Sequence, residues 1–337
     1  MSVNRQIRLK SRPVGATTAA NFDIVDGPMP AVVGAGVLRR TIYLSLDPYM
    51  RGRMSDAKSY AAPVNIGDVM VGHTVSQVIE SSNPDFRAGD FVAGYDGWQQ
   101  YAVSGGKELR KLDPHVVPIS TALSVLGMPG ITAYVGLMDI GKPQAGETVV
   151  VSAASGAVGS VVGQLAKVRG CRAVGIAGTE KKCRYVTDEL GFDSCVNYKS
   201  GNLTAALKEA CPNGVDVDFE NVGGAVLSAL LRLLNKGARV PLCGLISGYN
   251  ATADEGGPNL RPLLVSRALI QGFIVSDHFD RFGAALAEMT PLVRSGRLKY
   301  REDIADGLEA APDALIGLFE GRNFGKALVR VSPDPTR

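Results

Sequence analysis

The first part of the chain shows the alternation of apolar and polar residues that is typical of β-strands. Apolar and polar residues alternate in part over Val69–Glu80, and a second apolar run follows at Phe91–Tyr95. Two segments of turn-forming residues, Asn83–Asp85 and Ala88–Asp90, separate these runs. Because such segments connect neighbouring strands, residues 1–125 are predicted to be rich in β-structure.

Beyond residue 125 the pattern changes to short β-branched runs separated by segments of helical length. The runs predict strands at 148–153, 171–177, 194–197, 215–219, 238–243 and 269–275, and the segments between them predict helices that include 156–169, 180–190, 202–210 and 224–235. Strands that alternate with helices form a parallel sheet covered on both faces. We therefore expect an α/β protein with a doubly wound parallel sheet.

The end of the chain is expected to return to the β-rich region. A helix that contains Met289, Leu292 and Val293 precedes a strand-like run at 326–331. This order predicts two domains, a β-rich domain of residues 1–125 with 305–337 and a nucleotide-binding domain of residues 126–304.

Composition and charge exclude several classes of function. Of the 337 residues 45% are hydrophobic, and the formal net charge of +3 gives no electrostatic basis for binding nucleic acid or an anionic membrane surface. No apolar run approaches the ~20 residues that span a bilayer, and the charged segment Met1–Lys10 lacks the apolar core of a signal peptide. The sequence thus predicts a cytoplasmic protein that binds neither nucleic acid nor a membrane.

Cysteine is sparse, and its placement argues against disulfides and against a clustered structural zinc site. The 5 cysteines are odd in number and form no Cys-x-x-Cys pair. All of them lie in the second region, where they are expected to be small buried residues: Cys171, Cys183, Cys195, Cys211 and Cys243.

The clearest chemical signal is a turn of small residues between a predicted strand and a predicted helix. The run Val149–Val151 leads into Ala154, Gly156 and Gly159, an Ala-x-Gly-x-x-Gly pattern with alanine in place of the usual first glycine. Small residues let the backbone approach a dinucleotide pyrophosphate, and the helix start offers free N–H groups to it. The residues expected to bind the pyrophosphate are Gly156, Ala157, Val158 and Gly159.

The end of the next predicted strand indicates which dinucleotide binds. An NAD site usually carries an acidic residue there, whereas this chain has Gly178 and Thr179, followed by cations at positions 181, 182 and 184. A hydroxyl and several cations suit a 2′-phosphate, so NADPH/NADP⁺ is predicted, with Thr179 and Lys182 as partners of that phosphate. Glu180 is compatible with a 2′-phosphate site only if its side chain faces solvent. In the alternative interpretation, the cations form a solvated helix face and bind no phosphate.

Five separated segments resemble, in the same order, those of one enzyme family. They are Leu46–Met54, Gly127–Tyr134, Glu220–Gly224, Cys243–Asn250 and Asn323–Lys326. The chain resembles over nearly its whole length the zinc-independent double-bond reductases of the medium-chain dehydrogenase/reductase family. This group includes prostaglandin reductases, plant alkenal reductases and, most similar through residues 47–54, bacterial NADPH-dependent curcumin reductases. The resemblance implies a GroES-like β-rich domain and a Rossmann nucleotide-binding domain.

Zinc-dependent members of the same superfamily provide a contrast. They bind zinc through a cysteine of the N-terminal domain and a histidine that precedes a glutamate. Here Thr74 follows His73, and no cysteine precedes Cys171. We therefore expect no metal, and His73 is interpreted as a packed, hydrogen-bonded residue.

The resemblance also implies roles for individual residues. Tyr249, in a loop after a predicted strand, is the first candidate for a catalytic hydrogen-bond donor, and Tyr49 is the second, as a wall of the substrate pocket. Met128 and Thr132 are expected to line the same pocket. The further cofactor-binding residues are Tyr198, Asn221, Cys243, Gly244, Ile246, Ser247, Phe273, Ile274, Val275 and Asn323, of which Asn221 and Asn323 could instead be turn residues beside glycine.

The reaction implied by the resemblance is the NADPH-dependent reduction of the carbon–carbon double bond of α,β-unsaturated carbonyls. Hydride would add to the β-carbon, and a fixed donor would stabilise the enolate oxygen. Two alternatives stay open: an NADPH-dependent quinone oxidoreductase and a non-catalytic NADPH-binding or sensor protein. Analogy with the family also predicts a homodimer.

Overall fold

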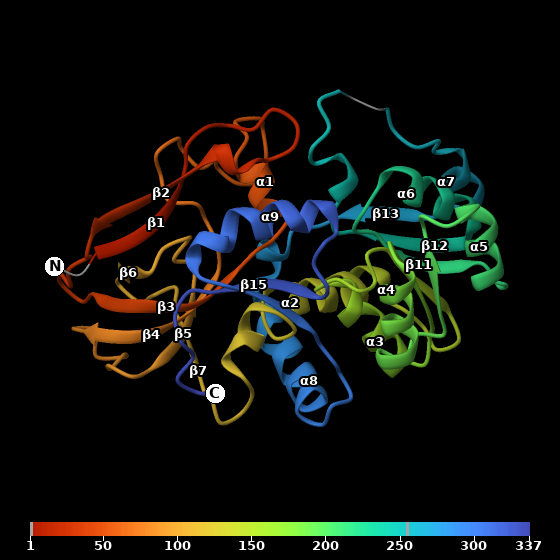
Figure 1. Cartoon of the computed structure of the whole chain (residues 1–337). Coiled ribbons are helices and arrows are strands. Elements are labelled where there is room, and N and C mark those ends of the chain that lie inside the picture. The colour runs from red at the N-terminus through yellow and green to blue at the C-terminus, as the bar shows by residue number, and fades with distance from the viewer. Residues whose placement is uncertain (1–2, 254–255) are drawn as a thin grey trace. The chain divides into compact units, whose positions relative to one another are not determined.

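The computed structural model describes residues 3–253 and 256–337, and the chain divides into two compact units. The mixed-sheet unit consists of Met1–Leu123 with Glu302–Arg337, and the parallel-sheet unit consists of Ser124–Arg301. Figure 1 traces both units from the N-terminus to the C-terminus. The assignment of these units as functional domains with the predicted boundaries stays a prediction.

The mixed-sheet unit contains a two-stranded sheet and a larger sheet. Strands β1 (Val3–Leu9) and β2 (Phe22–Pro28) pair antiparallel over their full length. The larger sheet has the order β14-β15-β3-β4-β5-β7, with β6 also paired to β3. Its strands are β3 (Val37–Ser45), β4 (Thr74–Ser81), β5 (Phe91–Gly94), β6 (Tyr101–Ser104), β7 (Arg110–Leu112), β14 (Glu302–Asp306) and β15 (Lys326–Arg330).

Short helices complete this unit. They are η1 (Ala19–Asn21), α1 (Tyr49–Arg53), η2 (Ile119–Leu123), η8 (Leu308–Ala310) and α9 (Ala311–Glu320). Only β14 and β15 pair in parallel within the larger sheet, and the remaining pairs are antiparallel. The C-terminal segment therefore joins the N-terminal strands in one sheet.

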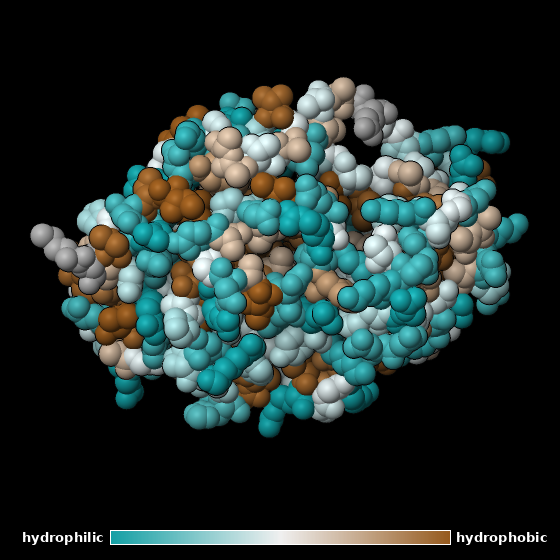
Figure 2. Space-filling view, viewed as in Figure 1, coloured by the Kyte–Doolittle hydropathy of each residue, from teal (hydrophilic) through white to brown (hydrophobic). Residues whose placement is uncertain are grey.

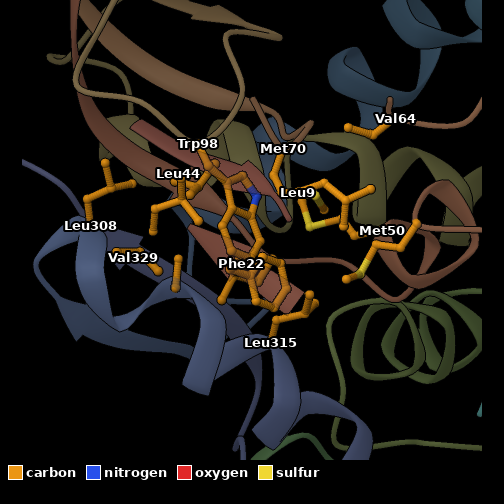
Figure 3. Packing of buried hydrophobic residues seen from close by; sticks show 14 of the residues in the cluster. Leu9, Phe22, Leu44, Met50, Val64, Met70, Trp98, Leu308, Leu315 and Val329 are labelled. Carbon is orange, nitrogen blue, oxygen red and sulfur yellow. The ribbon is translucent and has the colours of Figure 1, made fainter. Parts of the chain in front are cut away.

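The core of the mixed-sheet unit joins segments that are distant in sequence. Phe22 stacks on Trp98, with ring centroids 5.4 Å apart, and Leu44 packs in the same cluster (Figure 3). Leu315 of α9 and Val329 of β15 belong to this cluster, so both chain segments of the unit bury apolar surface together.

A buried ion pair lies beside this core. The Lys326 ammonium group donates to the carboxylate of Asp47 at 3.0 Å and to the carbonyl oxygens of Leu46 and Ala327, and both charged side chains are almost fully buried. Burial lowers the pKa of Lys326, against a smaller opposite effect of Asp47. Asp47 also accepts a hydrogen bond from Ser45, so its oxygens are engaged at the start of the loop that leads into α1.

The parallel-sheet unit has a sheet of six parallel strands in the order β10-β9-β8-β11-β12-β13. These strands are β8 (Thr148–Val151), β9 (Arg172–Ala177), β10 (Ser194–Asn197), β11 (Val215–Phe219), β12 (Leu234–Leu242) and β13 (Leu269–Gly272). In sequence order this is 3-2-1-4-5-6, the strand order of the Rossmann fold. The predicted doubly wound parallel sheet is thus confirmed.

Helices lie on both faces of this sheet (Figure 1). Helix α3 (Gly159–Val168) packs on β8 and β9 and on α2 (Met128–Val135), which also contacts α8 (Phe282–Arg294). On the other face α5 (Leu203–Ala210) packs against α6 (Gly224–Leu230). The remaining helices and turns are η3 (Gly136–Gly141), α4 (Glu180–Arg184), η4 (Tyr185–Glu189), η5 (Leu231–Leu233), η6 (Ile246–Gly248), α7 (Arg261–Ser266) and η7 (Val275–Arg281).

Several predicted element ends are wrong, each for a local reason. The helix predicted from 156 begins at Gly159, because residues before it form the turn that follows β8. The helix predicted over 224–235 ends at Leu230, and β12 begins at Leu234, four residues before the predicted start. The strand predicted from Val69 begins at Thr74, because Val69 instead bridges to Arg8 of β1.

The surface carries few large apolar areas on the face shown in Figure 2, where hydrophobic residues form small separate groups among hydrophilic ones. Within residues 3–253 and 256–337 no helix is long and apolar enough to cross a membrane.

Candidate active site

The strand order places a ligand-binding crevice at the carboxyl ends of β8 and β11. Strand β8 lies between β9 and β11, which is where the strand order of the sheet reverses. All four residues of β8, Thr148–Val151, are buried because helices cover both faces of the sheet. The loops after β8, β9, β11, β12 and β13 therefore end at one edge of the parallel-sheet unit.

In the glycine turn after β8, the backbone at Gly156 and Gly159 lies very close to the carbonyl oxygen of Ala153. Ala153 adopts the left-handed conformation, with φ of 52°, and turns its carbonyl oxygen toward the start of α3. A Cβ at Gly159 would lie 2.5 Å from this oxygen, and a Cβ at Gly156 would lie 3.1 Å from it. Any larger residue at 159 would force the turn open, so glycine is required there.

The start of α3 is suited to an anion. Val158, the residue before Gly159, contributes no side-chain cap to the helix. Uncapped N–H groups at a helix start, with the positive end of the helix dipole, bind phosphate when the backbone is accessible. The backbone N–H of Gly156 already donates to the carbonyl oxygen of Ala153 at 2.9 Å, and the binding of a dinucleotide pyrophosphate by Gly156, Ala157, Val158 and Gly159 stays a prediction.

A buried carboxyl group connects the ends of β8 and β11. Glu220 accepts hydrogen bonds from the Ser152 hydroxyl at 2.7 Å and from the backbone N–H groups of Val222 and Gly223 at 2.5 and 3.0 Å. The Ser152 hydroxyl in turn accepts from the backbone N–H of Asn221 at 2.7 Å. Burial raises the pKa of Glu220, while these hydrogen bonds lower it.

The side chain of Asn221 is held by the same network. Its amide group donates to the backbone oxygen of Ser152 at 2.8 Å, across the gap between β8 and β11. This bond fixes the side chain at the ends of the two strands, and its predicted contact with the nicotinamide end of the cofactor stays a prediction. Sequence analysis missed Ser152 and Glu220, although a polar residue directly after each buried strand is a signal for such a network.

The loop after β12 is hydrogen-bonded to this segment. Its backbone N–H groups donate to carbonyl oxygens that follow β11: Cys243 and Gly244 to Glu220 at 2.9 and 3.2 Å, Ile246 to Asn221 at 3.2 Å, and Ser247 to Val222 at 3.0 Å. The structure thus brings together Asn221 and the four predicted cofactor-binding residues of this loop.

Tyr249 follows η6 in that loop. Its hydroxyl lies 3.4 Å from the position that a Cβ on Gly244 would occupy, so the phenol lies against the backbone of its own loop. Burial raises the pKa of Tyr249, against a smaller lowering by a backbone hydrogen bond from Leu245. Burial and the Glu220 carboxyl also raise the pKa of the Cys243 thiol to about 12. Both groups are therefore protonated at neutral pH.

The end of β9 carries the predicted partners of the 2′-phosphate. The Thr179 hydroxyl accepts from the backbone N–H of Lys182 at 3.2 Å and caps α4. The Tyr198 ring lies against Gly178, because a Cβ at that glycine would be 3.0 Å from the ring. Glu180 is exposed and accepts from the side-chain amide of Asn197 at 2.7 Å.

The segment after β13 differs from the prediction. Strand β13 ends at Gly272, and Val275 already belongs to η7, so the predicted strand over 269–275 is too long. The Phe273 ring packs edge-on against Phe219 and His278 in the interior. The Phe273 side chain is therefore not available to a ligand, and the contacts of the backbone of Phe273, Ile274 and Val275 with the nicotinamide stay a prediction.

Met128 begins α2, and Thr132 lies one turn later. The Thr132 hydroxyl donates to the Met128 carbonyl oxygen at 2.7 Å, and Thr132 is buried. Its proton is thus used within the helix, which leaves Thr132 a packing role in the predicted pocket.

Asn323, in the mixed-sheet unit, donates to the Gly325 carbonyl oxygen at 2.9 Å, which is typical of a turn residue beside glycine.

The mixed-sheet unit contributes an aromatic cluster around α1. The Tyr49 hydroxyl donates to the Tyr95 hydroxyl at 3.5 Å, and Arg53 donates to the same oxygen at 3.2 Å. The His73 ring lies edge-on to both phenols, with centroid distances of 6.4 Å to Tyr49 and 4.7 Å to Tyr95. Burial, with Asp47 as a smaller cause, raises the pKa of Tyr49 well above its usual value.

The surroundings of His73 do not fit a catalytic zinc ion. Its Nδ1 is buried without a hydrogen-bond partner, which differs from the hydrogen-bonded histidine that the sequence predicted. Burial lowers the pKa of His73, and the neighbouring carboxylate of Asp47 is engaged by Lys326 and Ser45. In the described part of the chain, no three His, Cys, Asp or Glu side chains form a group that could hold a metal ion.

Comparison with known proteins decides the family. Residues 5–112 match the family model described as "N-terminal domain of oxidoreductase", and residues 157–290 match the one described as "Zinc-binding dehydrogenase". The chain is 51% identical to the NADPH-dependent curcumin reductase of Escherichia coli strain K12, over 98% of both chains. The chain belongs to the double-bond reductases of the medium-chain dehydrogenase/reductase family.

Two further members of this family support the assignment. The chain is 42% identical to the NADP⁺-dependent 2-alkenal reductase of Nicotiana tabacum over 98% of both chains. The crystal structure of CurA from Vibrio vulnificus in complex with NADPH superimposes with a TM-score of 0.94 at 52% identity, covering 98% of this chain and 100% of that chain. The family and the fold class predicted from the sequence are confirmed.

The buried acid beside the network generates a prediction about pH. Asp218 of β11 is fully buried with both carboxyl oxygens unpartnered, and burial together with Glu220 raises its pKa well above the usual value. The folded state therefore keeps a proton that the unfolded chain releases above pH ~4. This stabilisation is complete below that pH and is lost as the pH rises toward the folded-state pKa.

The Asp218→Asn substitution removes the titrating carboxyl group and keeps the shape of the side chain. We expect the free energy of unfolding of the variant, measured with urea, to fall less between pH 5 and pH 8 than that of the wild type, by roughly 1 kcal/mol or more. Glu209→Gln, which makes the same change of charge at an exposed position, serves as control. Parallel pH profiles for the wild type and Asp218→Asn would contradict the assignment.

Proposed function

We propose that this protein catalyses the NADPH-dependent reduction of the carbon–carbon double bond of α,β-unsaturated carbonyl compounds. The observation that carries the proposal is the position of Tyr249, whose phenol lies against Gly244 in the loop after β12, at the sheet edge that also carries the glycine turn. The names of the curcumin reductase and the 2-alkenal reductase, to which the chain is 51% and 42% identical, support the same reaction class.

The cofactor site follows from the loops at this edge. The turn at Gly156–Gly159 binds the pyrophosphate, and Thr179, Lys182 and Tyr198 bind the 2′-phosphate end. Within the parallel-sheet unit the nicotinamide end is bound by Asn221, Cys243, Gly244, Ile246, Ser247 and the backbone of 273–275, while a role of Asn323 stays a prediction. When bound, NADPH supplies the hydride that adds to the β-carbon of the substrate.

Tyr249 stabilises the charge that develops on the substrate. Addition at the β-carbon places negative charge on the carbonyl oxygen, and a fixed phenol O–H donates a hydrogen bond to it. One donor of this kind lowers a barrier by about 3–4 kcal/mol. Its raised pKa keeps the proton on Tyr249 at neutral pH, so the group acts as a donor throughout. Met128 and Thr132 form a wall of the substrate pocket in the parallel-sheet unit, while the role of Tyr49 stays a prediction.

The proposed reaction uses no zinc. The Asp47 carboxylate near His73 is engaged by Lys326 and Ser45, and among the described residues no three ligating side chains gather there, so hydrogen bonding stabilises the oxyanion in this proposal. The cytoplasmic location expected from the sequence stays a prediction.

We also propose a homodimer that covers the edge of the parallel sheet. Strand β13 is the last strand of the sheet, and apolar residues on it and on α7 are exposed: Leu264 by 78%, Val265 by 63% and Leu269 by 53%. An uncovered apolar edge strand tends to pair with another chain. Analogy with the family supports a second copy of this chain as the partner.

Replacement of Leu264 and Leu269 by glutamate tests the dimer. Charge on both positions is expected to convert the wild-type dimer into a monomer in sedimentation experiments. Val33→Glu, at a position that is 82% exposed in the mixed-sheet unit, is the control and should leave the dimer intact. A wild-type monomer at micromolar concentration would refute the proposal.

Replacement of Tyr249 by phenylalanine tests the reaction. We expect kcat for a simple enone to fall about 100-fold or more, while the dissociation constant for NADPH, measured by fluorescence titration, stays within a factor of about two. Tyr300→Phe, in the same unit, serves as control. An unchanged kcat would remove Tyr249 from the mechanism.

The same assay separates the alternative functions. A small quinone is tested beside the enone, because quinone reduction needs the same cofactor site. Preferred turnover of the quinone would favour a quinone oxidoreductase, and a failure to oxidise NADPH with either compound would favour a non-catalytic NADPH-binding protein.

Replacement of Lys182 by alanine tests the cofactor assignment. Loss of this cation is expected to weaken binding of NADPH about 10-fold, and binding of NADH by much less, because only NADPH carries the 2′-phosphate. Lys181→Ala removes the same charge from the exposed neighbouring position and should have a smaller effect. Equal losses of affinity for both nucleotides would contradict the role of Lys182.

A further inference from the structure

Glu180 is an acidic residue beside the proposed 2′-phosphate site. It begins α4 directly after Thr179, beyond the carboxyl end of β9. A carboxylate in this region favours NADH, because it accepts from the ribose 2′-hydroxyl group and repels a 2′-phosphate. The proposed cofactor carries that phosphate, so the contacts that hold Glu180 bear directly on which nucleotide binds.

A hydrogen bond ties Glu180 to the neighbouring strand. The side-chain amide of Asn197, the last residue of β10, donates to Oε1 of Glu180 at 2.7 Å. Asn197 pairs with Ala177 at the end of β9, and β10 is the outer strand of the sheet. The glycine turn follows β8, on the opposite side of β9. The bond therefore holds the carboxylate on the side of β9 that is remote from the glycine turn.

The Asn197 amide is itself fixed in one orientation. Its oxygen accepts from the backbone N–H of Lys199 at 3.1 Å, while its N–H group donates to Glu180. The two bonds use the acceptor end and the donor end of the amide, so only one orientation satisfies both. Asn197 is half-buried at the end of its strand, whereas Glu180 is exposed. The amide is thus the fixed partner, and it restrains the carboxylate.

A released Glu180 would place a negative charge within the proposed phosphate site. The ring of Tyr198, which follows Asn197, lies against Gly178 in the loop after β9, so the ends of β9 and β10 form one small area. A glutamate that is free to turn within this area can accept from a ribose 2′-hydroxyl group. The same carboxylate would repel a 2′-phosphate.

We propose that Asn197 is a positioning residue that sets the choice between NADPH and NADH, because it holds the Glu180 carboxylate away from the 2′ position of the bound nucleotide. This inference rests on the proposed cofactor site and adds a second part to it. Thr179, Lys182 and Tyr198 attract the phosphate, and Asn197 restrains the acid that would repel it.

The test measures the dissociation constants for NADPH and NADH by calorimetry, with no substrate present. Asn197→Leu keeps the approximate volume of the side chain and removes the donor. It is expected to weaken binding of NADPH about 10-fold and to tighten binding of NADH about 3-fold. A disturbed turn alone would weaken both nucleotides, so the gain for NADH is the signature of a released carboxylate.

A double-mutant cycle with Glu180→Gln shows whether Asn197 acts through Glu180. In the wild-type background this substitution should change both dissociation constants less than about twofold, because the carboxylate is already held away. In the Asn197→Leu background it should restore the preference for NADPH, since the neutral amide does not repel phosphate. Ser200→Ala is the control, because it removes the hydrogen bond from the Ser200 hydroxyl to the Asn197 carbonyl oxygen and leaves the bond to Glu180 intact. It should not change the preference.

A second variant keeps the test decisive if Asn197→Leu does not fold. Asn197→Asp retains the oxygen that accepts from Lys199 and removes only the donor to Glu180. It should lower the preference for NADPH, and the addition of Glu180→Gln should raise it again, because the new amide can donate to the carboxylate at position 197. A preference that both substitutions of Asn197 leave unchanged, or that Glu180→Gln fails to restore, would overturn the proposal.

Lys182→Ala, measured in the same way, separates this inference from the proposed cofactor site. If Lys182→Ala lowers the preference for NADPH and Asn197→Leu does not, the phosphate site stands and the role of Asn197 fails. If Asn197→Leu lowers the preference, Glu180→Gln restores it and Lys182→Ala has no effect, the role of Asn197 stands and that of Lys182 fails. Neither result depends on the proposed reaction, because no enone is present.

Discussion

The buried carboxyl group of Glu220 is the interaction on which the candidate cofactor site depends. One of its oxygens accepts from a hydroxyl that follows β8 and from two N–H groups that follow β11, so one acceptor joins two strands whose loops would otherwise be independent. Its backbone oxygen then accepts two N–H groups of the loop after β12. The loops after β8, β11 and β12 are thereby held together at one edge of the sheet. Each of them carries residues that we assign to the cofactor site.

The fold could be predicted because it depends on local patterns. Short β-branched runs separated by helical segments define a doubly wound sheet, and the turn from Ala154 to Gly159 identifies the strand at its centre. The requirement for glycine at 159 arises from a contact six residues away, between that position and the carbonyl oxygen of Ala153, so it leaves a signature within a single motif. The family resemblance then added the residues that lie far from this motif.

Features that depend on contacts distant in sequence could not be predicted in the same way. Val69 looks like the start of a strand, but its pairing with Arg8 separates it from β4. The helix expected to reach residue 235 gives way to β12 at Leu234, because that segment pairs with Val215 of β11. Tyr95 and Arg53 are 42 residues apart, and no pattern in either segment indicates that the guanidinium group bonds to the phenol.

The discontinuity of the mixed-sheet unit has a consequence for synthesis on the ribosome. Strand β15 lies between β14 and β3, and Lys326 forms its buried ion pair with Asp47, 279 residues earlier. The first 123 residues therefore emerge with an open sheet edge and a core that lacks Leu315 and Val329, and they must wait for the last segment of the unit. The parallel-sheet unit is continuous in sequence, so all of its residues have been made before the last segment of the mixed-sheet unit emerges.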